Sequence, residues 1–350
     1  TTEIYTLSLH DALPICLSGG LRTALSGMNV PTVMNIHLRQ CCAAAFVLWL
    51  AGAATLSAGE SGFAFTQAAG QVSITHDGQP VATYVFRNDK ILRPHYRQLH
   101  APGGIQVTRN CPPVAGRDAT DHDTMHPGLW LAFGDINGHD FWRNRAVIQH
   151  DQFIEPPAIL DGRLAFTTHN RLCTTSGQTV GTQRSRITLA ARPAGYLLIW
   201  EATFSAEQDH LVFGDQEEMG LGVRVATPLI EKNGGLITAS TGAKTASATW
   251  GKAFDWCDYS GVIGNRRAGV TLLTDPANFR PSWFHNRDYG LMVANPFGRK
   301  AMGQGDASRM EVKKGERLRL RFGVLLHSAP AEQGMDGAAA YRDFLAQIKD

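Results

Sequence analysis

The segment that decides the fold reads Leu318-Arg319-Leu320-Arg321-Phe322-Gly323-Val324, with an apolar side chain at every second position. Successive side chains of a β-strand point to opposite faces of a sheet, so this alternation predicts a strand with one face in a core. We expect Leu318, Leu320 and Phe322 to be buried together, while Arg319 and Arg321 face a polar side. Residues 196–204 show the same pattern, with Tyr196, Leu198, Trp200 and Phe204 on one face.

Further strands are expected on both sides of this pair. Residues 71–75 and 81–87 are β-type runs separated by Asp77-Gly78, which is a hairpin signal, and residues 184–189 alternate as well. In residues 219–225 the apolar residues alternate with glycine. Glycine inside a strand indicates close packing of a backbone or a ligand against it.

One helix is expected, at the end of the chain. Tyr341, Phe344, Leu345 and Ile348 recur at helical spacing, and Asp336 is placed to cap the helix start. Many strands with turn signals and one terminal helix predict an all-β protein, with two antiparallel sheets stacked on a shared core. We expect residues 59–350 to form this single domain.

The start of the chain has a different character. Residues 1–33 resemble translated sequencing-adapter and upstream sequence, with the natural start expected at Met34 or Met28. Residues 34–58 have the pattern of a secretory signal peptide: a basic start, an apolar run, and Leu56-Ser57-Ala58 as the cleavage site. The apolar run is shorter than the roughly 20 residues of a membrane span. We therefore expect a periplasmic or secreted protein.

Charge and cysteine usage restrict the possible partners. The formal net charge is +2, with no basic patch that would indicate nucleic acid, and no apolar run after the leader indicates stable membrane insertion. Beyond the leader, three widely spaced cysteines remain, Cys111, Cys173 and Cys257, and we expect buried thiols more than a disulfide framework. The oligomeric state is left open.

The segment 121–144 is the strongest indication of a functional site. It contains three histidines, four aspartates, two tryptophans and one arginine among turn-forming residues. A packed core has little use for so many titratable groups, because each one must be paired or hydrogen-bonded when it is buried. Aromatic faces beside charged hydrogen-bonding groups are what a sugar site needs. The alternative for any single residue is a satisfied polar turn.

Several motifs resemble one family in order along the chain, over about residues 62–327. They are residues 108–110, 121–144, 214–224, 250–251, 256–261, 285–290 and 295–298. The chain resembles the DUF6807 proteins, which often carry the label "PmoA family" or "methane oxygenase PmoA". The resemblance implies a large antiparallel β-sandwich of the galactose mutarotase-like supersandwich type. Methane oxygenase activity is not expected, because a membrane methane monooxygenase subunit needs several apolar spans.

A mutarotase-type site implies proton transfer between a carboxylate base and histidines that act as acids or oxygen ligands. Glu218, or its neighbour Glu217, is the candidate base, and His126 and His285 are the candidate acids. The candidate substrate-binding residues are Arg109, His122, Asp140, Trp142, Arg287 and Tyr289, with Trp130 as a further stacking face. We expect these side chains to converge on one concave face, with no cofactor and a small carbohydrate as the ligand.

Metal binding is the competing interpretation. His122 and His126 are four residues apart, and Asp121, Asp123 and His285 would complete a shell. Pro127-Gly128 follows at once, so no helix secures the geometry, and the metal-free site is preferred. Three function classes remain: an exported epimerase, lyase or hydrolase acting on a sugar or oxidised sugar; a non-catalytic carbohydrate-binding module; and a metal-dependent oxygenase or hydrolase.

Overall fold

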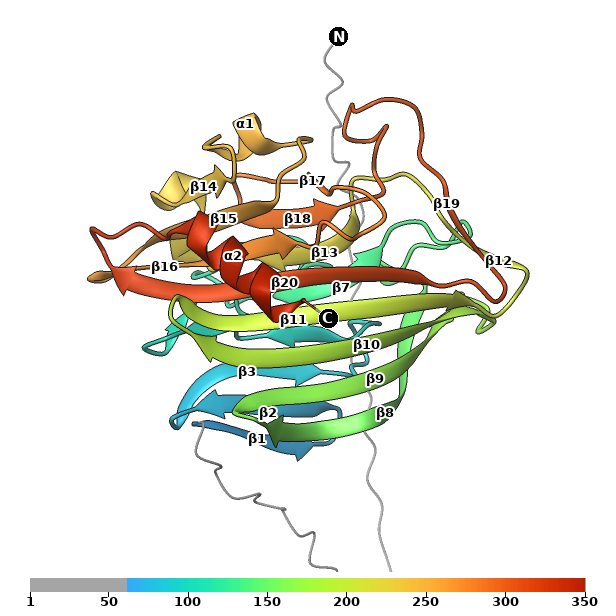
Figure 1. Ribbon diagram of the computed structural model, residues 1–350, viewed down its shortest axis with the longest axis horizontal. Coiled ribbons are helices and arrows are strands. Elements are labelled where there is room, and N and C mark those ends of the chain that lie inside the picture. Colours follow the sequence, from blue (N-terminus) through green and yellow to red (C-terminus); the bar gives the residue numbers. More distant parts are fainter. Residues whose placement is uncertain (1–61, 350) are drawn as a thin grey trace, which may run out of the picture. The chain divides into compact units, whose positions relative to one another are not determined.

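The computed structural model describes residues 62–349, which form two eight-stranded sheets (Figure 1). Every ladder within them is antiparallel, as the alternation predicts. The predictions for residues 1–33 and 34–58 lie outside the described residues.

The strands of the first sheet are, in spatial order, β1 (Phe63–Ala68), β2 (Gln71–His76), β3 (Gln79–Val85), β4 (His95–Arg97), β7 (Leu129–Phe133), β13 (Met219–Arg224), β18 (Leu291–Asn295) and β17 (Trp283–Phe284). Those of the second are β14 (Leu236–Ala239), β15 (Trp256–Ile263), β16 (Arg266–Thr274), β20 (Leu318–Pro330), β11 (Gly195–Ala206), β10 (Thr179–Arg192), β9 (Arg163–Cys173) and β8 (Val147–Leu160). Two short ribbons pair β5 (His100–Ala101) with β6 (Ile105–Gln106), and β12 (His210–Phe213) with β19 (Met310–Lys313). The helices are η1 (Thr227–Leu229), η2 (Glu231–Asn233), α1 (Ala246–Thr249) and α2 (Gly337–Gln347).

One hydrophobic core joins the two sheets. Leu318, Leu320 and Phe322 of β20 are at most 4% exposed and belong to it, as the alternation predicts. Aromatic rings cross between the sheets: Tyr96 and Trp200 have centroids 5.8 Å apart. The expected antiparallel sandwich is confirmed, because these inner rows bury the apolar surface of both sheets against each other.

The hairpin between β2 and β3 forms where Asp77-Gly78 predicts it. Both turn residues adopt the left-handed conformation, with φ of 49° at Asp77 and 74° at Gly78. A type I′ turn requires positive φ at both central positions, and its twist matches that of the flanking strands. The turn therefore sets the register in which His76 pairs with Gln79, and a bulge shifts the register between Thr75 and Ile74.

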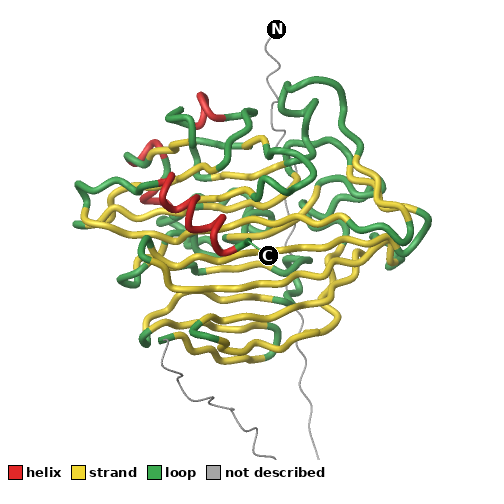
Figure 2. Tube along the Cα trace, in the orientation of Figure 1, coloured by secondary structure: helices red, strands yellow, loops and turns green. Residues whose placement is uncertain are grey.

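The outer face of the second sheet carries α2, which crosses it in Figure 1 and is the longest helix of the described part (Figure 2). Phe344 is fully buried in a separate cluster with Leu197 of β11 and Leu325 of β20. The Asp336 carboxylate accepts a hydrogen bond from the Ala339 amide at 2.9 Å, so the predicted cap is present.

Cys111, Cys173 and Cys257 are all buried as free thiols. Among the helices of residues 62–349, none has the length and apolar character needed to cross a membrane.

Candidate functional site

Three neighbouring strands of the first sheet, β7, β13 and β18, present a second face away from the sandwich core. Leu131, Leu221 and Met292 point into the shared core. The intervening residues of β7 and β18, including Trp130 and Val293, form a separate cluster. Because strand side chains alternate, this cluster marks the outer face of the first sheet.

Gly222 lets two tryptophans pack closely against this face, with their rings edge to face. A Cβ at Gly222 would lie 2.8 Å from Trp130 Cζ2 and 2.9 Å from Trp142 Cη2, which is closer than carbon atoms approach. The glycine alternation in β13 therefore reflects close packing, as predicted, and the partners are the indole rings of the protein itself.

A stack of rings leads from this floor to the surface. His126 stacks on Trp130, with centroids 5.2 Å apart and planes within 10°. His122 stacks on His126 at 4.8 Å, and Tyr289 is nearly parallel to His122 at 6.3 Å. His126 is 1% exposed, whereas the His122 side chain is 38% exposed. His122 is therefore the imidazole of the stack that a ligand reaches directly.

His126 is held in its neutral form. Burial lowers its pKa to about 2, and the nearby Arg224 guanidinium lowers it further. Its Nδ1 lies 3.4 Å from Arg224 Nη1, which can only donate, so the proton is assigned to Nε2. Within residues 62–349 that Nε2 has no hydrogen-bond partner, nor do the buried indole nitrogens of Trp130 and Trp142. A buried N–H group without a partner is costly unless water or a ligand satisfies it.

Asp121 connects the surface imidazole to a buried cation. Its two carboxylate oxygens accept hydrogen bonds of 3.0 and 3.1 Å from Arg224, and His122 Nδ1 lies 2.8 Å from Oδ2. Partial burial raises the pKa of Asp121, but the bonds from His122 and Arg224 outweigh it and hold this pKa well below its usual value. Asp121 is therefore a permanent carboxylate that orients His122.

Arg109 lies beneath the loop that carries Asp121 and His122. Its guanidinium donates to four backbone carbonyls of that loop, at Ala119, Asp121, His122 and His126, over 2.7 to 3.2 Å. Arg109 is 2% exposed. These contacts fix the loop, so Arg109 shapes the site from below.

Glu218 lies just before β13 and pairs with Arg143. Burial raises the pKa of Glu218, and the charge of Arg143 opposes this shift, followed by that of His122. Arg143 also contacts Asp140 at 3.1 Å. Asp140 in turn accepts hydrogen bonds from the Trp142 and Arg143 amides, so much of its bonding capacity stabilises the turn that carries Trp142.

A second carboxylate and arginine pair lies next to His285. Glu217 Oε2 lies 3.0 Å from Arg287 and 3.3 Å from His285 Nδ1. That same Nδ1 accepts a hydrogen bond from Trp250 Nε1 at 3.1 Å. Since an indole N–H can only donate, His285 is neutral and its contact with Glu217 is not an ion pair. Burial and Arg287 lower the pKa of His285 to about 3, in agreement.

The structure brings His126, Glu218 and His285 to the same outer face. His126 stacks on outward-facing Trp130. Glu218 precedes inward-facing Met219, so alternation turns it outward. His285 exchanges both backbone hydrogen bonds with outward-facing Val293, and directly opposed residues share a face. That this face forms a concave ligand site stays a prediction.

Tyr289 contacts the Asp121–Arg224 pair through Arg224. Arg224 is positioned over its ring, with Cζ 4.5 Å from the centroid. Burial raises the pKa of Tyr289, while Arg224 and Arg287 lower it and Glu218 and Asp121 raise it. The charges that act on the phenol are therefore those of Asp121, Arg224, Glu218 and Arg287.

The sequence left three contributors to this face without a role. Arg224 ends the glycine-rich strand, Arg143 lies three residues after Asp140, and Trp250 was recognised only as part of a family motif. A buried arginine at the end of a strand is a usable signal, because such a charge needs a partner.

The groups proposed as an alternative metal shell are engaged elsewhere. Asp121 is bound by Arg224, and the rings of His122 and His126 lie face to face. Within residues 62–349 no group of three or more histidine, cysteine, aspartate or glutamate side chains is arranged to hold a metal ion.

Fold and site together define a two-sheet antiparallel β-sandwich with an aromatic and charged outer face. The chain belongs to DUF6807, a family of unknown function whose model matches residues 71–340. The resemblance to that family is thus confirmed. No curated protein matches the sequence.

Solved structures similar to this chain include two of sugar-related proteins. A galactose mutarotase related enzyme from Lactobacillus acidophilus is 11% identical, with 77% of this chain and 99% of that chain covered and a TM-score of 0.31. An α-galactosidase from Lactobacillus brevis is 8% identical, with a TM-score of 0.33. The match covers 77% of this chain, which spans only 39% of the α-galactosidase.

Proposed function

We propose that this protein is an exported carbohydrate-active enzyme that transforms a sugar or oxidised sugar by acid/base chemistry on the outer face of the first sheet. One observation carries the proposal: His122, oriented by Asp121, reaches the surface within electrostatic range of Glu218. Export rests on the leader-like sequence of residues 34–58 alone.

His122 and Glu218 are the groups that exchange protons. His122 donates from Nδ1 to the permanent Asp121 carboxylate, which leaves Nε2 to take or give a proton. Glu218 acts as the base, because its raised pKa makes its carboxylate a stronger proton acceptor. His126 and His285 stay neutral and act as hydrogen-bonding groups for ligand oxygens, one of the two roles expected for them.

Charged and aromatic side chains around this pair suit a hydroxyl-rich ligand. Arg143 and Arg287 are each more than a third exposed, although each is paired with a glutamate. Their remaining N–H groups are free to bind hydroxyls or a carboxylate. Tyr289 contributes a phenol at the centre.

The test is a panel of neutral sugars and uronic acids incubated with the protein in D2O and followed by proton NMR. Deuterium exchange at a sugar C–H, anomer interconversion, a new double bond or a new reducing end each reports one reaction type. We expect the Glu218→Gln variant to lower the rate by about 10²–10⁴-fold, since it keeps the shape and removes the base. His122→Asn should lower the rate by a similar factor.

Glu311→Gln is the matched control, because Glu311 pairs with Arg309 in the β12–β19 ribbon, away from the three site strands. The Glu311→Gln variant should turn over the sugar at the wild-type rate. Saturable sugar binding without any turnover would replace the enzyme proposal with a binding module. Activity that survives in both Glu218→Gln and His122→Asn would refute the assignment.

A further inference from the structure

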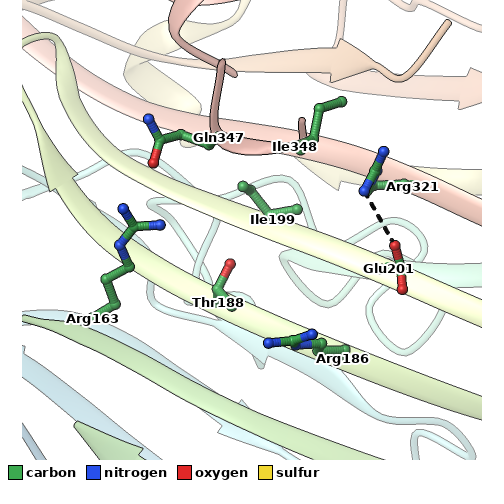
Figure 3. A pocket seen from close by; sticks show the side chains of 8 residues that line it. All are labelled: Arg163, Arg186, Thr188, Ile199, Glu201, Arg321, Gln347 and Ile348. Atoms are coloured by element: carbon green, nitrogen blue, oxygen red, sulfur yellow. Dashed lines mark hydrogen bonds and ion pairs between the residues drawn. The ribbon is translucent and has the colours of Figure 1, made fainter. Parts of the chain in front are cut away.

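A pocket of about 220 Å³ lies on the outer face of the second sheet (Figure 3). It belongs to a different sheet from the candidate active site. Its lining comes from β9, β10, β11, β20 and the end of α2: Arg163, Arg186, Thr188, Ile199, Glu201, Arg321, Gln347 and Ile348.

The acidic groups on this side are already neutralised by other arginines. Glu201 lies 3.4 Å from both Arg319 and Arg321. Arg321 also contacts Asp275 through Nε at 2.7 Å, and Arg319 reaches Asp275 at 3.5 Å. Among the described residues, these two carboxylates and two guanidinium groups therefore pair with one another.

Arg163 and Arg186 are left without a counter-charge. Both are exposed, and neither side chain makes a hydrogen bond or an ion pair with any residue in 62–349. Arg186 is directly opposite Glu201 in the β10–β11 ladder, yet that carboxylate turns to Arg319 and Arg321 instead. Two positive charges therefore lie at one pocket without a partner among residues 62–349.

The rest of the lining suits a small polar ligand. Figure 3 shows Thr188 between Arg163 and Arg186, with its cross-strand partner Ile199 above it and Gln347 above Arg163. The hydroxyl and the amide supply further donors, while Ile199 offers an apolar patch. The volume is below the roughly 300–1,000 Å³ of pockets for drug-sized ligands, so one small group fits.

We propose that this pocket is an oxyanion-binding site, held by Arg163 and Arg186, for a carboxylate or a sulfate or phosphate group. Guanidinium groups bind such oxyanions through paired N–H bonds, stronger than bonds between neutral groups. The anion is either free in solution or attached to a sugar. The site is independent of the proton-transfer chemistry proposed for the first sheet.

The test is isothermal titration calorimetry of the folded protein with sodium sulfate, sodium galacturonate and galactose. We expect saturable binding of at least one anion, weakening as sodium chloride is raised and not displaced by galactose. Galacturonate binding more tightly than sulfate assigns the site to an acidic sugar; the reverse assigns it to a free oxyanion. Each arginine is expected to contribute about tenfold in affinity.

The Arg163→Ala/Arg186→Ala double variant should therefore lose roughly a hundredfold in affinity for the anion, about tenfold for each arginine. Arg317→Ala is the matched control, because Arg317 is also exposed but precedes β20 outside the pocket, and this variant should bind the anion as the wild type does. Circular dichroism checks that the double variant is folded; if it is not, Arg163→Gln and Arg186→Gln are titrated singly. Unchanged affinity in the arginine variants, displacement of the bound anion by galactose, or no saturable anion binding would overturn the proposal. The glutamate and histidine variants of the first sheet should leave this binding intact.

Discussion

Arg109 and Arg224 are both buried arginines of the candidate site, but their neighbours give them different roles. Arg109 donates to backbone carbonyls and so fixes a loop. Arg224 binds the carboxylate of Asp121 through two bonds and covers the ring of Tyr289. Both charges lower the pKa of Asp121, but only Arg224 donates hydrogen bonds to its carboxylate.

Gly222 is the residue where the smallest change should have a large effect. Gly222→Ala inserts a methyl group less than 3 Å from both Trp130 and Trp142, so the rings must move. Overpacking of this kind costs about 1–3 kcal/mol. We expect a lower midpoint of urea unfolding and, because Trp130 supports the histidine stack, a reduced rate of sugar turnover.

Gly334→Ala is the control for that substitution. A Cβ at Gly334 meets nothing within 4 Å, and its φ is outside the left-handed region. Its unfolding midpoint should stay within error of the wild type or rise slightly. Equal stability of the two alanine variants would show that the tryptophans adapt freely.

At the scale of elements, α2 depends on its cap as well as on its apolar face. Asp336→Ala removes the hydrogen bond to the Ala339 amide and should cost about 1 kcal/mol. Asp336→Asn retains a side-chain oxygen at the same position and should cost much less. Chemical unfolding of the three proteins measures both differences, and a loss as large in Asn as in Ala would assign the effect to charge instead.

At the scale of the whole molecule, buried neutral imidazoles make stability depend on pH. Burial lowers the pKa of His126 to about 2, and of His95 and His285 to about 3, from an ordinary 6.5. Below pH 6.5 the unfolded chain binds these protons and the folded protein does not, so stability is full above pH 6.5 and falls as the pH drops. Each imidazole contributes at most about 1.4 kcal/mol per pH unit.

Urea unfolding at several pH values between 6.5 and 5 measures this slope before most carboxylates titrate. His126→Gln should lower the slope of unfolding free energy against pH by at most about 1.4 kcal/mol per pH unit, which corresponds to one proton. His210 is exposed, so His210→Asn controls for the loss of an imidazole elsewhere. A slope that His126→Gln leaves unchanged would mean that the folded protein does protonate His126.

The sequence by itself determined the strands, the β2–β3 hairpin, the capped helix and the stacking of two antiparallel sheets. These features follow from apolar side chains that recur every two residues in strands and every 3.6 residues in the helix, and from the turn residues between them. Residues close together in the sequence specify both. It also placed His126, Glu218 and His285 among the candidates, because their residue types and motifs stand out.

Only the tertiary structure decided how those candidates differ. Burial under the loop makes His126 neutral, while its neighbour His122 reaches solvent and Asp121. Partners such as Arg224 and Arg143 come from other strands or turns. The pocket at Arg163 and Arg186 likewise depends on which arginines Glu201 engages. Burial and pairing between distant segments are set by register and packing, and no local sequence pattern encodes them.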